Sequence, residues 1–189
     1  EQGARCKPEN SNWLPFIRNA VGPMDFTPGS MFSAQPEDNR STGANPMGTG
    51  TRAYQMALYV VFESPLQMLA DNPVLYRREH PCTEFLAAVP TTWDSLRVLH
   101  AACGREVVVA RRKGDKWYVG GITNDRPYTT EIALDFLPAG RTFTMTSFED
   151  GVNADLQATD YRKRVREVDA STVVKVEMVR NGGWAAVIE

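Results

Sequence analysis

The sequence predicts an α/β segment followed by an all-β region that forms an antiparallel sandwich. Three observations support this class. The first half contains one strong apolar helix pattern, its short apolar runs end at acidic residues, and the second half reads as strand after strand. At 189 residues, 42% of them hydrophobic, the chain is large enough for one large or two small domains. We expect a division into residues 1–91 and 92–189.

The clearest helix pattern covers residues 51–62, TRAYQMALYVVF. Ala53, Met56 and Val60 mark one face at helical spacing, but aromatic and aliphatic side chains occupy much of the remaining surface. A helix that is apolar on nearly all sides must be covered by other elements on more than one side. We therefore expect this helix to be sandwiched between other elements and to end before Pro65.

Two apolar stretches of the first half lead into aspartates. Residues 15–21 are predicted as a strand that exits toward Asp25, and residues 66–69 as a buried strand that ends at Asp71. Folds with parallel strands place functional side chains at such exits, although an isolated aspartate there more often forms a turn or a helix cap. Asp25 and Asp71 are therefore candidate binding residues. The polar loop 29–50 between them has a length typical of functional or disordered loops.

The second half alternates apolar and polar residues between turn signals. Strands are predicted over residues 106–112, 116–122, 130–136, 141–148, 172–180 and 184–188. Six or more short strands of this kind favour an antiparallel sandwich. Gly120 and Gly121 lie inside one strand pattern and indicate a bulge or a close contact.

Composition narrows the function classes. The formal net charge of −2 gives no reason to expect a nucleic acid or an anionic membrane as partner, and the basic runs 110–113 and 161–166 are interpreted as solvated strand ends. No apolar run approaches the ~20 residues of a membrane span. The sequence has no zinc-type cysteine spacing, no phosphate-binding glycine loop and no nucleotide motif. Among the tryptophans, Trp117 and Trp184 fit core positions, whereas Trp13 lies in a loop and is a candidate for stacking on a sugar ring.

Six separated blocks, in order, resemble glycoside hydrolase family 97 and together span nearly the whole chain. They are PFIRNAVGPMDFTPG (15–29), GTRAYQMALYVVFESPLQMLAD (50–71), TEFLAAVPTTWD (83–94), VARRKGDKWYVGGIT (109–123), FEDGVNAD (148–155) and GGWAAVI (182–188). The resemblance implies a β-supersandwich, a central (β/α)8 barrel and a C-terminal sandwich. Residues 1–91 would then be the terminal portion of the barrel, with its seventh and eighth strands and helices, and residues 92–189 the C-terminal sandwich.

The resemblance also implies α-glycosidase chemistry with a glutamic acid as general acid and a calcium ion held by glutamates. Glu1 resembles the last glutamate of the family pattern Glu-Gly-x-x-Gly-x-Glu, which would make it the general acid and a calcium ligand. A second alignment gives the acid role to Glu9, but Pro8 before it fits the pattern less well than the Glu1-Gln2 pair. The catalytic base or nucleophile and the other calcium glutamates would lie upstream.

Within the family, residues 59–69 (YVVFESPLQML) resemble the inverting, α-glucosidase-like branch more than the retaining, α-galactosidase-like branch. The resemblance thus implies an α-linked oligosaccharide substrate derived from starch and a periplasmic or secreted location in a Gram-negative bacterium. Because the chain opens at Glu1 without a methionine, we expect it to be part of a longer enzyme and inactive alone. The missing barrel or self-association would cover the apolar helix. The alternative is a non-catalytic sandwich module that supports a barrel or binds glycans.

Overall fold

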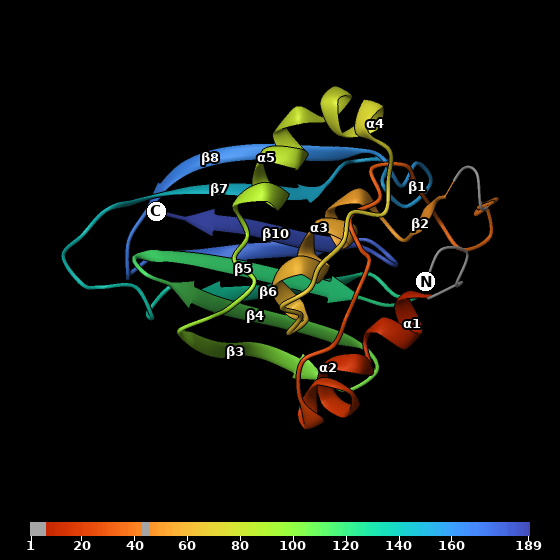
Figure 1. Cartoon of the computed structure of the whole chain (residues 1–189). Coiled ribbons are helices and arrows are strands. Elements are labelled where there is room, and N and C mark those ends of the chain that lie inside the picture. The colour runs from red at the N-terminus through yellow and green to blue at the C-terminus, as the bar shows by residue number, and fades with distance from the viewer. Residues whose placement is uncertain (1–6, 43–45) are drawn as a thin grey trace.

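The computed structural model describes residues 7–42 and 46–189 and is built around a six-stranded antiparallel sheet with the order β3-β4-β5-β10-β7-β8 (Figure 1). The strands are β3 (Ser95–Ala102), β4 (Glu106–Lys113), β5 (Lys116–Thr123), β7 (Phe143–Asp150), β8 (Tyr161–Val168) and β10 (Gly183–Ile188). A two-stranded antiparallel sheet of β6 (Tyr128–Ala133) and β9 (Val173–Met178) packs on one face.

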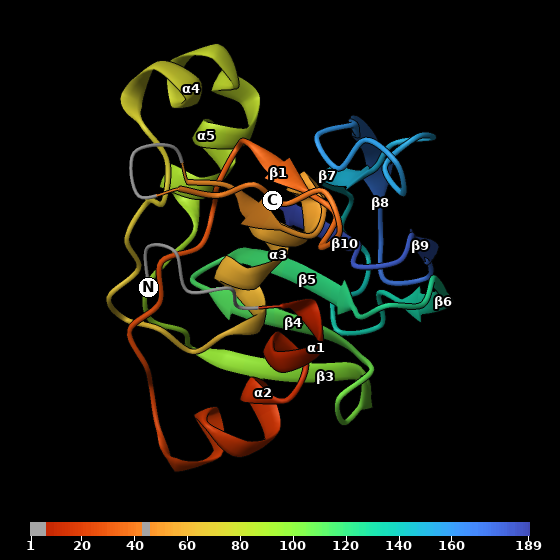
Figure 2. The ribbon, with the colours of Figure 1, turned by 90° about the vertical axis from the view of Figure 1, so that its right-hand side faces the viewer.

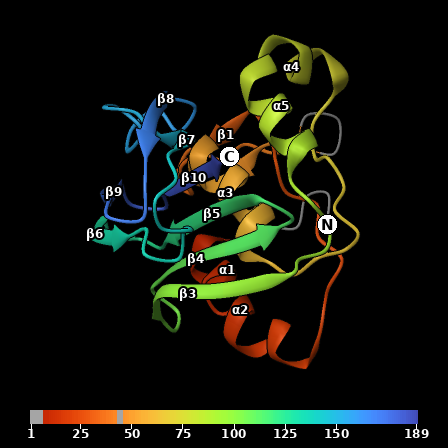
Figure 3. The ribbon, with the colours of Figure 1, turned by 90° about the vertical axis from the view of Figure 1, so that its left-hand side faces the viewer.

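Helices cover the opposite face of the large sheet (Figures 2 and 3). They are α1 (Pro8–Ser11), α2 (Leu14–Ile17), the 3₁₀ helix η1 (Asn19–Val21), α3 (Arg52–Val61), α4 (Pro73–Arg78) and α5 (His80–Ala88). Two short strands, β1 (Ser33–Ala34) and β2 (Gly48–Thr49), pair in parallel at the two ends of the long polar loop. The views place α1 and α2 beside β3, and α4 and α5 toward β7 and β8.

Helix α3 is buried along its whole length, as its apolar pattern predicts. Its cover comes from elements of this chain, chiefly β5 and β10, so the expectation that a missing barrel or self-association covers this helix is wrong. Thr51 caps it, because the Thr51 hydroxyl accepts a hydrogen bond from the Tyr54 amide. The helix can approach the sheet closely because β5 and β10 present glycines there. A Cβ on Gly120 would lie 2.8 Å from Val60 Cβ, and a Cβ on Gly183 would overlap the Tyr54 backbone. Close packing, not a bulge, therefore explains the glycine in the β5 pattern.

The large sheet has an apolar core on each face. Val107 and Val109 pack with α3 and α5, whereas Val108 and Ala110 pack beneath β6 and β9. This alternation is the one expected when consecutive strand residues point to opposite faces. Trp117 and Trp184 are buried in the second core, which confirms their assignment to the interior.

The sandwich-like second half and the apolar helix are confirmed, but three local predictions are wrong. Residues 15–21 form α2 and η1 and no strand, since Pro15 suits the first turn of a helix. Residues 66–69 form no regular buried strand: Leu66 and Leu69 are half exposed, and only an isolated parallel bridge joins Gln67 to Phe26. The basic run 161–166 spans most of β8 and is largely solvated, whereas Arg111 of the run 110–113 is buried in β4, so the interpretation of both runs as solvated strand ends is wrong.

In the described part of the chain the main sheets are antiparallel, and parallel pairing is limited to β1 with β2 and to the extended segments 24–28 and 63–70, which hydrogen-bond to each other but form only one isolated bridge. A closed barrel is therefore not present among the described residues. The expected boundary at residue 91 falls between α5 and β3 and stays a prediction.

Candidate functional site

Two extended segments, residues 24–28 and 63–70, run side by side in parallel. Besides the bridge between Phe26 and Gln67, the Met68 amide donates to the Phe26 carbonyl at 3.1 Å. At the two ends of the segments, the Met24 amide donates to the Glu63 carbonyl and the Ala70 amide to the Pro28 carbonyl. Helix α3 lies between these segments in the sequence, so the three form a strand–helix–strand crossover of the kind that parallel pairing requires. Asp25 belongs to the first segment and is exposed, whereas Asp71 directly follows the second.

Asp71 holds the start of the long polar loop. Its Oδ2 accepts hydrogen bonds from the Ser30 hydroxyl (3.1 Å) and from the amides of Met31 (2.9 Å) and Phe32 (3.0 Å). The Asp71 amide in turn donates to the Tyr76 hydroxyl, and burial raises the pKa of Tyr76 to about 12. Three donors on one carboxylate oxygen make Asp71 a positioning residue for residues 30–32.

Arg52, the first residue of α3, joins four elements. Its Nη1 lies 2.9 Å from Glu79 Oε2 at the α4–α5 junction, and its Nε and Nη2 donate to the Met31 carbonyl at 3.1 and 2.8 Å. The guanidinium also lies 5.2 Å from the centre of the Tyr161 ring on β8. A buried guanidinium satisfied in this way stabilises one arrangement of the loop over the sheet.

Asp150 ends β7 and ties the sheet to the start of α3. Its buried carboxylate accepts hydrogen bonds from the Thr51 hydroxyl at 2.6 Å and from the amides of Val179 (3.0 Å) and Gly183 (3.1 Å). Burial raises the pKa of Asp150 to about 7, although the three donors act in the opposite direction. Because Thr51 also caps α3, a single carboxylate links helix, strand end and turn.

The long polar loop is bound to the sandwich at a second place. Gln35 donates to the carbonyls of Ala154 (3.1 Å) and Arg180 (3.2 Å) and accepts from the Asn181 side-chain amide (2.9 Å). Arg180 forms an ion pair with Glu37, which lowers the pKa of that carboxyl. The loop is therefore an ordered strap across the end of the sheet at these positions.

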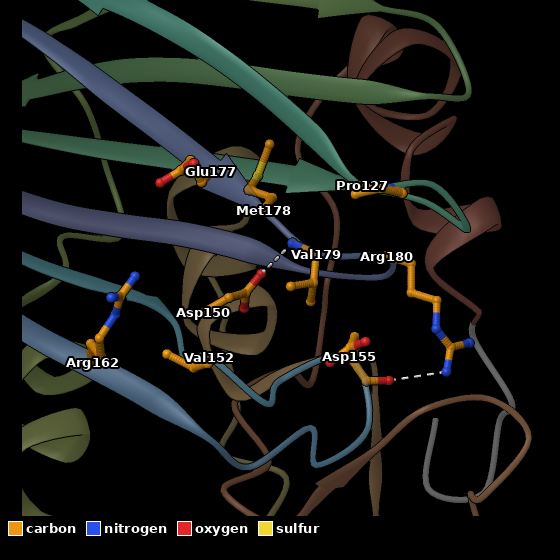
Figure 4. Close-up of a pocket in the computed structure, with 10 residues that line it drawn as sticks. Pro127, Asp150, Val152, Asp155, Arg162, Glu177, Met178, Val179 and Arg180 are labelled. Atoms are coloured by element: carbon orange, nitrogen blue, oxygen red, sulfur yellow. Dashed lines mark hydrogen bonds between the residues drawn. The ribbon is translucent and has the colours of Figure 1, made fainter.

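A pocket opens beside Asp150, between the ends of β7, β8 and β9 (Figure 4). Its walls combine apolar side chains with two arginines and three carboxylates; it is lined by Pro127, Asp150, Gly151, Val152, Asp155, Arg162, Glu177, Met178, Val179 and Arg180. Arg180 reaches across one side and donates to the Asp155 carbonyl at 3.0 Å. Among these described residues there is no aromatic ring on which a sugar could stack.

The structure does not bring the predicted site residues together. Glu1 lies outside the described residues. Glu9 is exposed on α1, and Trp13 is 45% exposed and lies against the β3–β4 turn, where a Cβ on Gly104 would come within 2.6 Å of its Cε2. Asp71, by contrast, lies two residues before Pro73, the first residue of α4. The views show α4 away from α1.

The described residues do not by themselves fit a calcium ion. Across residues 7–42 and 46–189, no three histidine, cysteine, aspartate or glutamate side chains gather as a metal-binding group. Calcium requires six to eight oxygen ligands. A calcium role for Glu1 therefore stays a prediction.

Sequence reasoning missed Arg52 and Asp150. Asp150 lies just after a predicted strand and Arg52 within the helix pattern, and neither position by itself indicates a functional residue. A polar residue at the end of an alternating strand was the one available signal for Asp150. Its three partners, Thr51, Val179 and Gly183, lie 99, 29 and 33 positions away in the sequence, beyond the reach of a local pattern.

The second half of the chain matches a known protein family. Residues 92–189 match a family model described as "Glycosyl-hydrolase 97 C-terminal, oligomerisation". No described helix is long and apolar enough to cross a membrane.

Two curated relatives match nearly the whole chain. A protein of Bacteroides thetaiotaomicron named retaining alpha-galactosidase is 43% identical over 93% of this chain, and one of Streptomyces bingchenggensis named probable retaining alpha-galactosidase is 32% identical over 92%. The chain spans only about a quarter of their length, 26% and 25% respectively.

Solved structures agree with these matches. A glycoside hydrolase family 97 enzyme of Pseudoalteromonas sp. strain K8, solved in complex with acarbose, is 36% identical with a TM-score of 0.85. Its complex with panose gives 35% identity and a TM-score of 0.84. In both cases the match covers 97% of this chain and 28% of the solved chain.

Proposed function

Because the chain belongs to glycoside hydrolase family 97, we propose that it is the C-terminal part of an α-glycosidase. In this proposal residues 1–91 complete the catalytic barrel and residues 92–189 form the sandwich against which it packs. The observation that carries it is the strand–helix–strand crossover of segments 24–28 and 63–70 around α3, since that is the repeating unit of a (β/α)8 barrel.

Exposed apolar side chains on the first half support the same proposal. Ile17, Val21, Leu66, Leu69 and Val74 are all more than half exposed. A contiguous partner is expected where large apolar side chains concentrate on a soluble protein. The remaining strands and helices of a barrel would cover such residues.

For the whole enzyme we propose α-galactosides as substrates and a retaining mechanism. The relative named retaining alpha-galactosidase is 43% identical, compared with 36% for the enzyme solved with acarbose. The curated relatives' names thus do not support the α-glucosidase specificity and inverting mechanism that the sequence resemblance favoured. Those two properties are the competing outcome of the test.

Within this enzyme, Glu1 is proposed to donate the proton to the leaving oxygen. Asp71 is proposed to position residues 30–32 through its three hydrogen bonds, and exposed Asp25 to bind a substrate hydroxyl. A general acid lowers the barrier to cleavage, because it protonates the departing oxygen as the glycosidic bond breaks.

The substrate proposal is tested on the longer polypeptide that contains this chain. We expect nitrophenyl α-galactoside to be cleaved at least about tenfold faster than the α-glucoside, a difference of ~1.4 kcal/mol in barrier. Proton NMR of the first product should show the α anomer, as retention requires. Preferential cleavage of the glucoside with a β product would return the assignment to the inverting branch.

The acid role is tested with Glu1→Gln and Glu9→Gln in the same polypeptide. Loss of a general acid slows cleavage of substrates with poor leaving groups by about 10²–10⁴-fold, whereas kcat/KM for activated nitrophenyl substrates, which reports the bond-breaking step, is largely spared. Their kcat still falls, because the same residue is the base of the second step in a retaining enzyme. We expect this pattern for Glu1→Gln only. The same pattern in Glu9→Gln would favour the second alignment. Its absence from both variants would show that neither Glu1 nor Glu9 is the general acid.

A second candidate function is favoured by the description of the matching family model, which names oligomerisation. We propose that residues 92–189 also mediate assembly of the whole enzyme. Sedimentation velocity of the longer polypeptide over a hundredfold concentration range tests this: a single monomeric species throughout would contradict it.

A further inference from the structure

The small sheet has an unpaired edge along β9. The Leu134 amide donates to the Thr172 carbonyl at 3.0 Å, and the antiparallel register continues from this bond along β6 and β9. Backbone groups alternate in direction along a strand, so Val173, Lys175 and Glu177 direct their amides and carbonyls away from β6. Within the described residues β6 is the only strand paired with β9. This edge is therefore a template for one more strand.

A row of arginines faces the space beside that edge. Arg162, Arg164 and Arg166 alternate along β8 and are 42%, 50% and 36% exposed. Arg166 is paired with Met145, which belongs to the core beneath β6 and β9. The arginines thus lie on the same face of the large sheet as the small sheet, on the strand that the small sheet leaves uncovered (Figure 2).

The arginines share one carboxylate. Glu149 is 11% exposed, and its oxygens lie 3.9 Å from Arg162, 3.3 Å from Arg164 and 3.1 Å from Arg166. Three guanidiniums around a single carboxylate leave an excess of positive charge, and each has further donors to offer.

The arginine row and the free edge face each other. Glu177 on β9 has a lowered pKa, chiefly because Lys175 donates to it and also because Arg162 and Arg164 lie near. Arg162 and Glu177 both line the pocket of Figure 4, from opposite sides. We use the name β8–β9 groove for the surface between the arginine row and the edge of β9, which carries Arg162, Arg164, Arg166, Val173, Lys175 and Glu177; the pocket forms one end of it and includes Arg162 and Glu177.

We propose that the β8–β9 groove binds an extended acidic segment of another protein as a third strand of the β6–β9 sheet. Backbone hydrogen bonds to Val173, Lys175 and Glu177 would supply the pairing. Alternate residues of any strand are about 6.6–6.8 Å apart, so carboxylates at every second position of the ligand match every second position of β8. The arginine row then selects the acidic sequence.

The chain's own strands do not supply such a ligand. No described strand carries carboxylates at successive alternate exposed positions: β6 contributes only Glu131, β8 only Glu167 and β9 only Glu177. None of the described strands therefore supplies the complementary charge pattern, and the ligand that we propose is a segment of a partner protein. This inference is independent of the glycosidase proposal, because it rests on the sandwich alone.

The probe is a fluorescent octapeptide of alternating valine and glutamate, titrated with the full 189-residue chain and followed by fluorescence anisotropy at low salt. We expect saturable binding that weakens about tenfold or more in 0.2 M salt, and at least about tenfold weaker binding of the valine–lysine peptide. Equal binding of the two peptides, or no binding at millimolar chain, would overturn the proposal.

Two further controls separate strand pairing from charge attraction. In an antiparallel third strand, the residues opposite Val173, Lys175 and Glu177 share their exposed face and direct their amides to β9, whereas the residues that face the arginines direct theirs away. N-methylation of the valines should therefore abolish binding, whereas N-methylation of the glutamates should not. Equal effects of the two modifications would exclude strand addition.

Charge selection is tested with Arg164→Glu and, as a matched control on the opposite face of β8, Lys163→Glu. We expect at least about tenfold weaker peptide binding for the first and less than about twofold for the second. Matching circular dichroism spectra establish that both fold. If Arg164→Glu instead abolished self-association seen by sedimentation and left peptide binding unchanged, the occupant would be a second copy and the proposal would be wrong.

Discussion

The two faces of the six-stranded sheet are built differently although the same strands supply both. On one face α3 approaches so closely that β5 needs glycine at Gly120, and Arg52 and Asp150 add buried polar ties. On the other face two strands cover part of the sheet, and β8 keeps an exposed arginine row. The difference teaches that the helical face fixes the first half of the chain onto the sandwich, whereas the strand face leaves surface free for a partner.

Two neighbouring glycines on β5 provide the most direct test of whether the helical face is packed more tightly than the strand face. A Cβ on Gly120 would lie 2.9 Å from the Ala57 carbonyl oxygen, whereas one on Gly121 would meet the flexible Met178 side chain at 3.3 Å. We expect Gly120→Ala to lower the free energy of unfolding by about 3 kcal/mol and Gly121→Ala by less than about 1 kcal/mol. Urea denaturation of the full chain measures both. Equal losses would mean that the two faces are packed alike.

Asp150 tests the polar tie on the helical face. Asp150→Ala leaves the Thr51 hydroxyl and the amides of Val179 and Gly183 without an acceptor, so we expect a loss of about 2–3 kcal/mol in the free energy of unfolding. Asp150→Asn should cost less, because one amide oxygen still accepts from the two backbone amides.

The same residue predicts a pH dependence. Its pKa is raised in the folded state from 3.8 to about 7, so the folded state holds the proton more tightly. The corresponding stability is fully present below about pH 4 and is lost as pH rises toward 7, by at most roughly 4 kcal/mol. Asp150→Asn should remove this component of a stability–pH profile; an unchanged profile would show that Asp150 is already ionised at acidic pH.

Arg52 is expected to have the next largest effect. Arg52→Met removes the partner of Glu79 and two donors to the Met31 carbonyl, and should cost about 2 kcal/mol. Arg78 is a matched control, since it also lies near Glu79, at 3.9 Å, but is exposed; Arg78→Met should cost less than about 0.5 kcal/mol. Faster proteolysis of the long loop in Arg52→Met alone would locate the effect.

The smallest effect is expected on the open face. Glu149→Gln removes the carboxylate shared by Arg162, Arg164 and Arg166, and mutual repulsion should then lower the free energy of unfolding by about 1 kcal/mol at low salt. Salt at 0.5 M should restore most of this loss by screening. A loss above about 3 kcal/mol, insensitive to salt, would show that this face is as tightly organised as the helical one.

Local pattern was sufficient for much of the fold. The helix at 51–62 and most strands of the second half were predicted because apolar periodicity reports which side chains must be buried. β8 was not predicted as a strand, because its arginines replace the apolar residues that normally reveal one face. Residues 66–69 were predicted as a buried strand on the same principle, yet they are exposed. Apolar composition indicates that the side chains of a segment are more stable when buried, but it does not show that the covering residues belong to the same chain.

The candidate site was less accessible to this reasoning. Asp25 and Asp71 were selected by position alone, and only the structure distinguishes the exposed carboxylate from the one engaged by Ser30, Met31 and Phe32. The ties made by Arg52 and Asp150 have no local signature, since each joins residues far apart in the sequence. The arginine row of β8 is visible as the basic run 161–166, but its position beside the edge of β9 is decided by the tertiary structure.

By itself the sequence determined the family, the division into a helical first half and a stranded second half, and the interior placement of Trp117 and Trp184. The tertiary structure alone decided which charged side chains are buried as ties and which stay exposed. The physical reason is that burial of a charge depends on donors and dielectric supplied by distant segments, as Thr51 supplies them to Asp150, whereas periodicity is a property of neighbours.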